Sequence, residues 1–590
     1  MRRDPLVVLK FGSSVLRSEA DLPRAVHEIY RWLRRGHSVL AVVSAFGNTT
    51  DDLLASARRY TEEPQEGALA LLLSTGEKRC AALLSLALDR AGICAATLDP
   101  ARLGLRTSGR VLNAEPVRIN VGAVRRALEQ SSVVVVPGFI GQMQDGSTSL
   151  LGRGGSDLSA LFLAAHLNAS RCRLLKDVGG VYESDPNLGR SRRYRSISWD
   201  DAVALGGRIV QSKALRFARE HNLRFEVAGL GEERATTVGA NVTEFYTEHC
   251  AEAPLRVTLL GLGTVGWGVY QELLAHPDLF EVVGVAAKHR EKHDGRVPAH
   301  LFSTDIFAIA ARECDVVIEL IGGVHPAVEC IAAALEAGKH VVSANKAAIA
   351  QAPNLHNIAR RNGVKLLYSA AVGGAVPVLE QLEQLAQLNE ICAIDGVLNG
   401  TTNFILHEVA RGIPFEQAVA SAQAAGLAEA DPSSDLDGSD VACKLVLIAR
   451  ACGVEISLGE VRRTGITEID PRHVFDLSKS GSAVRLVGSI RRASEETQQA
   501  ASLVASSGPP IYVAEVKPAV LEASHPLART RREDNCVVVE FQNGEKKILR
   551  GKGAGRWPTT ESVLADLFTL VHQNSRTSTH SEEAAEAVAS

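Results

Sequence analysis

A glycine-rich turn with the spacing G-x-G-x-x-G follows an apolar run at 255–260 and precedes a helical pattern at 269–274. Strand, turn and helix thus stand in the order that a dinucleotide-binding loop requires. Gly261 permits the tight turn, Gly263 lets the backbone approach a pyrophosphate, and Gly266 allows close packing of the helix, whose first N–H groups hold the phosphates. The predicted loop consists of Gly261, Gly263, Thr264, Val265 and Gly266.

Basic residues follow the second strand of the same unit. The run EVVGVAA ends in Lys288, His289 and Arg290, at the place where a site that prefers NAD carries an acid for the ribose 2′-hydroxyl. Positive side chains suit a 2′-phosphate instead. We therefore expect NADPH, with Lys288 and Arg290 as its ligands and NADH as the alternative. A solvated positive turn without a binding role is the other interpretation.

A further group of chargeable residues lies downstream. Lys346 follows a buried strand at 341–343, at the edge where α/β sheets place their ligands. Asp440 and Lys444 are four residues apart in a predicted helix, so they share one face and each tunes the charge of the other. The loop before this helix is acidic, as in a site for an ammonium group or in a solvated loop. Its acids are Glu429, Asp431, Asp435 and Asp437.

The N-terminal part contains two further glycine-rich turns after apolar strands. The first is KFGSS, which includes Lys10, Gly12 and Ser13. The second, in LLGRGGSDLSALFL, opens a helix at Ser156 and Asp157, so loop and helix N–H groups can surround an anion. Neither turn matches the P-loop GxxxxGK[ST]. We expect a phosphate site of another kind.

The scaffold for these turns is predicted by an alternation of short apolar runs with longer helical patterns. Such runs stand at 6–9, 39–43, 133–136, 257–260, 282–286, 316–320 and 341–343. Nearly continuous apolar strands between helices indicate parallel sheets that are covered on both faces, so the fold class is α/β. Periodicity is lost at 240–254 and a new strand follows directly, which indicates two units joined there.

The composition fits an enzyme that acts on small molecules. A chain of 590 residues is too long for one core, and 46% hydrophobic with 22% charged residues is the balance of a globular protein. The net charge of −4 creates no field that would attract nucleic acid or an acidic membrane. We see no signal peptide, no membrane-length apolar run and no close pairing among the ten cysteines, and we expect a cytoplasmic protein.

The motifs of the C-terminal part resemble homoserine dehydrogenase. They are DVVIELIGGVHPAVECIAAALEAGKHVVSANKAAIA (315–350), AAVGGAVP (370–377), NGTTNFIL (399–406), AGLAEADPSSDLDGSDVACKL (425–445) and GKGAGRWPTTESVLADL (551–567). The resemblance implies a Rossmann-type dinucleotide domain at 255–378, completed by about 546–573, and an α+β substrate and dimerisation domain at 379–545. The implied reaction is the reduction of L-aspartate 4-semialdehyde to L-homoserine.

Roles for the charged residues follow from this resemblance. Hydride addition to an aldehyde requires that its oxygen be polarised and protonated, a task for a lysine. The resemblance implies that Lys444, next to Asp440, is the acid–base residue. It places Asn345 and Lys346 beside the cofactor, with Lys346 also near the substrate. Glu429 and Asp440 are the implied acids that face the substrate, and Asp435 is expected beside them.

A monovalent cation is also implied, at the backbone carbonyls of Val372 and Ala375. Many family members carry a glutamate three residues before the valine, whereas this chain has Ser369. Because this carboxylate is missing, the sequence leaves the cation undecided.

The motifs of the N-terminal part resemble the amino-acid kinase fold, and aspartokinase in particular. Besides the two turns they include VVSAFGNTTDDLL (42–54), STGEKR (74–79), KDVGGVYESDP (176–186) and RIVQSKAL (208–215). The resemblance implies a kinase domain at 1–245 that phosphorylates L-aspartate with Mg²⁺-ATP, followed by a linker at 246–254. The implied site residues are Lys10 and Asp157 at the phosphoryl group, Glu77 and Arg153 at aspartate, and Gly12, Ser13 and Lys213 at the nucleotide.

This part departs from the family pattern at two motifs. KFGSSVL stands where KFGGTSV is usual, and KDVGG stands where TDVDG is usual. One alternative is therefore a kinase-like domain that binds or assembles without turnover, and another is a kinase for glutamate or its acetylated form. The usual pair of regulatory ACT domains does not fit between 240 and 254, so we expect no inhibition by threonine or lysine through such domains.

We therefore expect a bifunctional enzyme of the aspartate pathway. The two implied reactions are not consecutive, because aspartyl phosphate must be reduced between them. We expect a homodimer or higher homo-oligomer without a nucleic-acid or membrane partner. The segment from 574 to 590 lacks large apolar residues, and we expect it to be a disordered tail.

Overall fold

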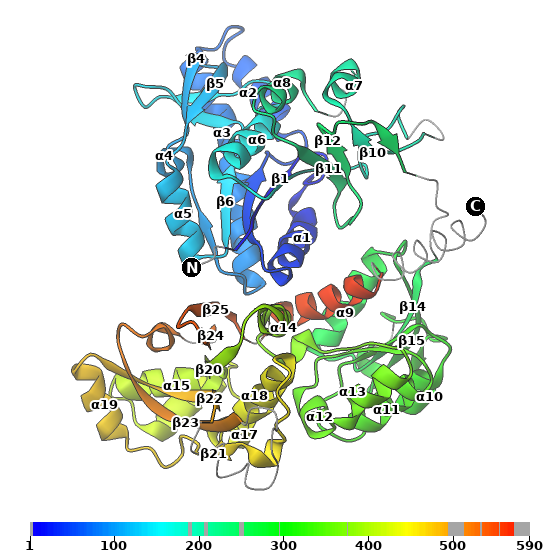
Figure 1. Cartoon of the computed structure of the whole chain (residues 1–590), viewed down its shortest axis with the longest axis vertical. Coiled ribbons are helices and arrows are strands. Elements are labelled where there is room, and N and C mark those ends of the chain that lie inside the picture. Colours follow the sequence, from blue (N-terminus) through cyan, green and yellow to red (C-terminus); the bar gives the residue numbers. More distant parts are fainter. Residues whose placement is uncertain are drawn as a thin grey trace. The chain divides into compact units, whose positions relative to one another are not determined.

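The computed structural model describes residues 4–186, 191–205, 210–246, 253–293, 295–374, 376–493, 512–531, 534–553 and 555–571. The chain divides into two compact units between Ala251 and Glu252, and each is described by itself (Figure 1). This division falls inside the predicted linker, whereas the predicted tail at 574–590 lies outside the described residues. No helix within the described ranges is long and apolar enough to cross a membrane.

The N-terminal unit alternates strands and helices as its apolar pattern predicts. Its elements are β1 (Leu6–Phe11), α1 (Leu22–Arg34), β2 (Ser38–Val43), α2 (Thr49–Arg58), α3 (Glu66–Arg90), β3 (Ala95–Thr97), α4 (Pro100–Leu103), β4 (Arg106–Arg110), β5 (Asn113–Arg118), α5 (Val121–Gln130), β6 (Val133–Pro137), β7 (Ile140–Gln142), β8 (Thr148–Leu150), α6 (Gly155–Leu167), β9 (Arg171–Lys176), β10 (Tyr194–Ile197), α7 (Trp199–Ala204), α8 (Ser212–Glu220), β11 (Phe225–Gly229), β12 (Thr236–Val238) and β13 (Glu244–Phe245).

Among the described residues these strands form a large sheet with the order β13-β10-β12-β11-β9-β1-β2-β6-β3 and a small one with the order β5-β4-β7-β8. The centre of the large sheet is parallel, because β1 pairs with β2 and β9, and β2 pairs with β6. Consecutive residues Val7, Val8 and Leu9 are all inaccessible to solvent, so both faces of β1 are covered. Helices α1 and α6 lie beside β1 (Figure 1). The carboxyl ends of β1, β2 and β9 therefore meet at one sheet edge.

The C-terminal unit begins with a dinucleotide-binding domain of Rossmann type. Its elements are β14 (Leu255–Leu260), α9 (Thr264–Ala275), β15 (Phe280–Ala286), β16 (Phe302–Ser303), α10 (Ile306–Ala311), β17 (Val316–Glu319), α11 (Ala327–Glu336), β18 (His340–Ser343), α12 (Lys346–Gln351), α13 (Asn354–Arg361) and β19 (Leu366–Leu367). The strands are parallel in the order β16-β15-β14-β17-β18-β19, which is the order of the dinucleotide fold. The predicted α/β fold class is confirmed.

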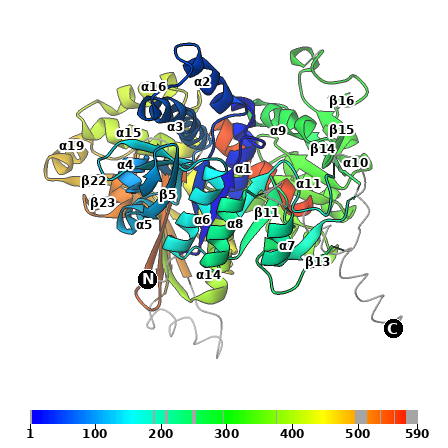
Figure 2. The same ribbon diagram turned by 90° about the horizontal axis from the view of Figure 1, so that it is seen from above.

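A second domain of this unit is built on an antiparallel-rich sheet. Its elements are α14 (Val378–Leu388), β20 (Ile391–Val397), α15 (Gly400–Ala410), α16 (Phe415–Ala424), α17 (Ser433–Leu436), α18 (Ser439–Ala451), β21 (Arg462–Arg463), α19 (Pro471–Lys479), β22 (Ser482–Arg492), β23 (Tyr512–Glu522), β24 (Asp534–Phe541) and β25 (Lys546–Lys552). The strand order is β21-β23-β22-β20-β24-β25. Helices α15, α18 and α19 pack against β22, and Figure 2 again shows α15 and α19 beside β22 and β23.

The end of the chain returns to the dinucleotide domain later than the sequence predicted. We expected the return from about residue 546, but β25 pairs with β24 and so belongs to the second sheet. The helix at 556–571 makes the return: its Val563 and Leu567 are buried in one cluster with Leu255 and Val257 of β14. A pattern of alternating apolar residues predicts a strand but does not show which sheet the strand joins. For this reason the return was predicted too early in the chain.

Candidate active sites

The glycine turn after β14 has the geometry of a phosphate-binding loop. Gly261 has φ +101°, and a Cβ there would lie 2.5 Å from the carbonyl oxygen of Leu320. A Cβ at Gly266 would lie 2.1 Å from the carbonyl oxygen of Gly261, so both positions require glycine. A Cβ at Gly263 would meet no atom within 4 Å, which leaves open space in front of the first turn of α9. The turn therefore fits a dinucleotide pyrophosphate.

Two arginines and a histidine line a cavity beyond the end of β15. The cavity has a volume of about 390 Å³, and its lining includes Arg290, His293, Arg296 and Phe302. The guanidinium of Arg290 lies 5.8 Å from the ring centroid of Phe302. Lys288 is exposed and does not belong to the lining. Arg296 was not predicted, because nothing in the local pattern showed that the chain turns back beside Arg290.

Lys346, Asp440 and Lys444 come together at one point. Lys346 is the first residue of α12 in the dinucleotide domain, whereas Asp440 and Lys444 lie on α18 of the second domain. The Nζ atom of Lys346 is 2.8 Å from Oδ1 of Asp440, and that of Lys444 is 2.9 Å from Oδ2. One carboxylate is thus shared by two ammonium groups from different domains.

The charges of this cluster hold one another in place. Burial alone would raise the pKa of Asp440, but the positive charges of Lys444 and Lys346 keep it well below its usual range. The charge of Asp440 in turn raises the pKa of Lys346, against the effect of burial. The lysines differ in access, since the side chain of Lys346 is 41% exposed and that of Lys444 is 8% exposed. The ammonium of Lys444 also donates to the carbonyl oxygen of Leu398 at 2.6 Å.

Asn399 is a member of this cluster that sequence reasoning missed. Its Nδ2 donates to Oδ2 of Asp440 at 2.9 Å and to Oδ1 of Asp435 at 2.6 Å. Its Oδ1 accepts from the backbone N–H of Thr402 at 2.8 Å and caps α15. Burial, and then the negative charge of Asp440, raise the pKa of Asp435. The only signal in the sequence was a helix N-cap in NGTTNFIL.

Glu429 stands apart from these residues. Its side chain is exposed, and within the described ranges its carboxylate contacts none of the cluster residues. Its backbone carbonyl oxygen accepts from Nε2 of Gln423 at 3.2 Å. Asp435 is connected to the lysines through Asn399 and Asp440, whereas Glu429 lies at the surface.

A buried carboxyl group connects the strand ends next to Lys346. Glu319, at the end of β17, accepts from the backbone N–H of Ile321 at 2.7 Å and from the hydroxyl of Ser343 at 2.6 Å. Asn345 donates from Nδ2 to the carbonyl oxygen of Ile321 at 2.9 Å and caps α12 with its Oδ1. Burial raises the pKa of Glu319. Asn345, predicted to contact the cofactor, thus also fixes the start of the helix that carries Lys346.

The region of the predicted cation has a different arrangement from the one that the family pattern implies. Ser369 donates from its hydroxyl to Oδ1 of Asp566 at 2.7 Å and from its N–H to Oδ2 at 3.1 Å. Val372 is buried, and Ala375 lies outside the described residues. A carboxylate is therefore present near Ser369, supplied by the C-terminal helix instead of by residue 369 itself.

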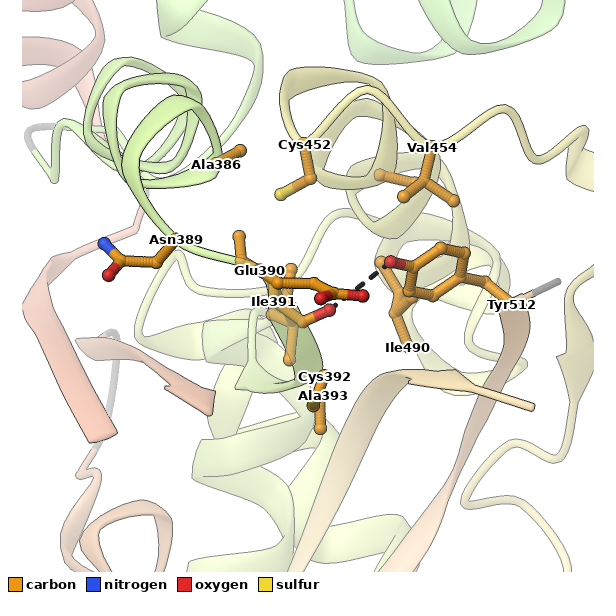
Figure 3. Close-up of a pocket in the computed structure, with 12 residues that line it drawn as sticks. Ala386, Asn389, Glu390, Ile391, Cys392, Ala393, Cys452, Val454, Ile490 and Tyr512 are labelled. Atoms are coloured by element: carbon orange, nitrogen blue, oxygen red, sulfur yellow. Dashed lines mark hydrogen bonds between the residues drawn. The ribbon is translucent and has the colours of Figure 1, made fainter. Parts of the chain in front are cut away.

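A separate cavity of about 130 Å³ lies at the other end of α18 from Asp440. Figure 3 shows Cys452, Cys392 and Glu390 around it, with the hydroxyl of Tyr512 directed to the carbonyl oxygen of Ile391 at 3.3 Å. Burial raises the pKa of Cys452 to about 12, so its thiol is not a ready nucleophile. This cavity contains none of the predicted site residues.

The N-terminal unit contains a second cluster of one aspartate and two lysines. Lys10 on β1 places its Nζ 2.8 Å from Oδ1 of Asp157, which lies in the first turn of α6. Lys176, the last residue of β9, places its Nζ 2.9 Å from Oδ2 of Asp157. Burial would raise the pKa of Asp157, but Lys10 and Lys176 lower it to about 2. Lys176 was known only as part of the unusual KDVGG, and its pairing with Asp157 was missed.

Gly12, which the chain retains from the family motif, lies against the ammonium group of Lys10. A Cβ at Gly12 would lie 2.9 Å from Nζ of Lys10. Ser13, which replaces the lost glycine, is exposed. In KDVGG, a Cβ at Gly179 would lie 2.7 Å from both Nη1 of Arg193 and Oε2 of Glu232, which form an ion pair of 2.8 Å. An acid at this position would require Arg193 and Glu232 to move.

The other predicted residues of this unit are spread around the sheet edge. Glu77 on α3 is buried and accepts from the backbone N–H of Ala45, just after β2, at 3.2 Å; burial raises its pKa to about 7. Arg153 is exposed. Lys213 donates to Oδ1 of Asn113 at 3.0 Å and to the carbonyl oxygens of Ala114 and Leu151 at 2.8 and 3.0 Å. The structure does not bring Lys213 to Asp157.

Comparison with known proteins agrees with this division of the chain. Residues 5–229 match the family model "Amino acid kinase family". Residues 261–369 match "Homoserine dehydrogenase, NAD binding domain", and residues 377–568 match "Homoserine dehydrogenase". The homoserine dehydrogenase of Bacillus subtilis is 34% identical over 330 residues, which are 54% of this chain and 73% of that protein. That of Mycobacterium tuberculosis is 36% identical over 330 residues, 54% of this chain and 72% of that protein.

Solved structures with a likeness to the chain are also homoserine dehydrogenases. The enzyme of Thiobacillus denitrificans is 31% identical, with a TM-score of 0.49 over 55% of this chain and 74% of that one. A hyperthermophilic archaeal homoserine dehydrogenase in complex with NADPH is 23% identical, with a TM-score of 0.44 over 53% of this chain and 96% of that one. From the family models and the relatives in sequence, the chain belongs to the homoserine dehydrogenase family and carries an amino acid kinase domain in front, an arrangement consistent with a bifunctional aspartokinase/homoserine dehydrogenase.

Proposed function

We propose that the C-terminal unit reduces L-aspartate 4-semialdehyde to L-homoserine with NADPH. The observation that carries this proposal is the shared carboxylate of Asp440, which holds two ammonium groups at the carboxyl edge of the dinucleotide domain. Such a cluster offers both a proton and a positive charge to a developing alkoxide. The nicotinamide, when bound, supplies the hydride.

The chain's residues divide the remaining tasks. Lys444 is the acid–base residue: its ammonium protonates the carbonyl oxygen as charge develops there. Lys346, the more exposed of the two, orients that oxygen and the cofactor. Asp440 stays ionised, so it keeps both lysines positive and fixed. Asp435 binds the substrate ammonium group, with Asn399 holding its carboxylate toward Asp440.

The preference for NADPH is supported by the cavity beyond β15. Arg290 and Arg296 place two guanidinium groups around it, and guanidinium groups bind phosphate well. We propose that these arginines, more than Lys288, bind the 2′-phosphate. Replacement of both by serine is expected to lower the ratio of kcat/KM for NADPH to that for NADH about tenfold or more. An unchanged ratio would place the 2′-phosphate elsewhere.

The dehydrogenase activity is tested by incubating the purified chain with homoserine and NADP or NAD and following absorbance of the reduced nicotinamide. Lys444→Met should abolish turnover while cofactor fluorescence still reports binding. A protein that binds NADPH but oxidises no homoserine would disprove the substrate assignment and leave the fold intact.

For the N-terminal unit we propose phosphorylation of L-aspartate by Mg²⁺-ATP. The support is Lys10 and Asp157 at the sheet edge, the retained Gly12, and the buried Glu77, which accepts from the N–H of Ala45 just after β2. Lys10 neutralises the transferring phosphoryl group, while Glu77 binds the substrate ammonium and Arg153 a substrate carboxylate. Catalysis would consist mainly of positioning and charge stabilisation.

The alternative is a domain that binds a nucleotide without turnover. One observation favours it: the ammonium group of Lys213 donates hydrogen bonds to three acceptors away from Asp157. Release of ADP that depends on both aspartate and Lys10 decides between the two. Glutamate and acetylglutamate belong in the same assay as alternative acceptors. No ADP release with any of these acceptors would leave only the binding role.

A further inference from the structure

Lys176 occupies a position at the sheet edge that favours contact with phosphate. It is the last residue of β9, and β9 is the direct parallel neighbour of β1, with Phe11 opposite Leu175. The register brings its ammonium to the same carboxylate that Lys10 uses, at 2.9 and 2.8 Å respectively. Its side chain is 14% exposed, so most of its surface is buried.

The cluster has one more positive charge than it has negative charges. Lys10 and Lys176 bring two positive charges, and Asp157 brings one negative charge. Within the described ranges, neither lysine has a second carboxylate partner. A buried charge without a counterion is costly, so a site of this kind is completed by an anion. The glycine turn and the first turn of α6, where Asp157 lies, add backbone donors at the same place.

Lys213 does not take this role. Its ammonium has three donors, and Asn113, Ala114 and Leu151 accept hydrogen bonds from it. Glu115 adds a carboxylate at 3.1 Å, so the charge of Lys213 is already balanced on the β4–β5 hairpin. Lys176 is therefore the second lysine, beside Lys10, whose ammonium group contacts the carboxylate of Asp157.

We propose that Lys176 is a second phosphate-binding residue of the N-terminal unit, which neutralises the terminal phosphate of ATP together with Lys10. This inference rests on the proposed kinase function. In the transfer, the bond between the γ-phosphorus and the bridging oxygen breaks and its electron pair stays with ADP, while an oxygen of the acceptor carboxylate forms the new bond to phosphorus. No proton is needed, so Lys176 acts through its charge alone.

The test is the binding of ATP, of inorganic tripolyphosphate and of adenosine to the full-length chain, measured by calorimetry. In Lys176→Met, affinity for ATP and tripolyphosphate should fall about ten- to a hundredfold, the usual effect of one hydrogen bond to a charged group, while adenosine binding stays unchanged. Lys176→Arg should restore most of the loss. Lys78→Met, which removes an exposed ammonium from α3, is the matched control. Unchanged adenosine binding verifies that the N-terminal unit of each variant is folded.

The outcomes separate the inference from the proposed function. Equal ATP affinity of Lys176→Met and the unchanged chain overturns the inference, even if aspartate-dependent ADP release persists. Equal losses for ATP and adenosine also overturn it, because they indicate a structural role. Phosphate binding that depends on Lys176 without ADP release upholds the inference and refutes the kinase. If the unchanged chain binds neither ATP nor tripolyphosphate, both fail.

Discussion

The two halves of the chain each hold one aspartate between two lysines, at the same pair of distances, 2.8 and 2.9 Å. They assemble the group in different ways. Lys10 and Lys176 end up together because their strands, β1 and β9, are neighbours in one sheet. In the C-terminal unit, Lys346 comes from the dinucleotide domain, and Asp440 with Lys444 from the second domain.

This difference shows that the charge arrangement alone does not decide the chemistry. The N-terminal cluster is closed, since all three side chains are at most 14% exposed. The C-terminal cluster leaves the side chain of Lys346 41% exposed. In the proposed functions, an anion completes the first cluster by its charge, whereas the second offers a proton to a bound aldehyde.

Replacement of the aspartate at the centre of each cluster should have the largest effect on activity. Asp440→Asn leaves two buried or half-buried ammonium groups without their carboxylate, and breaking such a pair costs about 3–5 kcal/mol. We expect homoserine oxidation to fall on the order of a thousandfold. Asp157→Asn should have the same effect on ADP release. Each variant should leave the other activity unchanged.

Both activities are measured on the same preparation, with unfolding followed by calorimetry. If Asp440→Asn retained a third or more of the dehydrogenase kcat, the shared carboxylate would have no role in the reaction. If it also removed kinase activity, the two clusters would not be independent.

The next largest effect separates the two lysines of the C-terminal cluster. Lys444→Met removes the acid–base group, which usually contributes at least about a hundredfold to kcat. Lys346→Met keeps Lys444 and Asp440 together and should act more on KM, because it removes an orienting contact. Steady-state kinetics with homoserine measure the split. The reverse order, with kcat lost mainly in Lys346→Met, would assign the proton transfer to Lys346.

The comparison also shows what the sequence could predict. The sheets were predictable because uninterrupted apolar runs such as 133–136 become strands that are covered on both faces. The glycine turn was predictable because its geometry depends on three neighbouring residues. Asp440 and Lys444 were predictable as a pair, because four residues in a helix bring two side chains to one face.

Contacts that depend on tertiary structure were not predictable in this way. The pairing of Lys176 with Asp157 depends on which strand lies beside β1, and apolar periodicity does not contain that information. Asn399 reaches Asp435 and Asp440 only because α15 and α18 pack on the same sheet. Asp566 contacts Ser369 from a helix 197 residues further along the chain, so no local pattern at Ser369 could indicate it.

A pH profile of the kinase reaction should give an effect of about tenfold per pH unit. Burial raises the pKa of Glu77 from 4.5 to about 7, so its carboxylate is lost below pH 7. If it binds the ammonium of aspartate, kcat/KM of the kinase should fall about tenfold per unit below that pH. The pKa of Asp440 lies below its usual range, so it causes no such fall in the dehydrogenase. Glu77→Gln should give low activity at all pH values and a flat profile.

The same shift predicts a pH dependence of stability. Because the folded protein binds the proton of Glu77 more tightly than the unfolded chain does, the N-terminal unit should lose stability as pH rises from 4.5 to about 7. Glu77→Gln should remove that part of the slope. Thermal unfolding of the unit between pH 5 and pH 8, with and without the substitution, measures it. An identical slope in both proteins would contradict the raised pKa.

The smallest effect tests how the C-terminal cluster is assembled from two domains. Arg450, near the end of α18, donates to the carbonyl oxygens of Ile349 and Ala350 at 2.7 and 3.0 Å, and so fixes the end of the helix that begins with Lys346. Arg450→Met removes both bonds without touching the cluster. We expect kcat/KM for homoserine to fall several-fold and unfolding of this unit to lose about 1–3 kcal/mol, as for hydrogen bonds of charged groups. The N-terminal cluster needs no such link, because its lysines share a sheet. Unchanged kinetics in a destabilised Arg450→Met would mean that Lys346 keeps its position without this link.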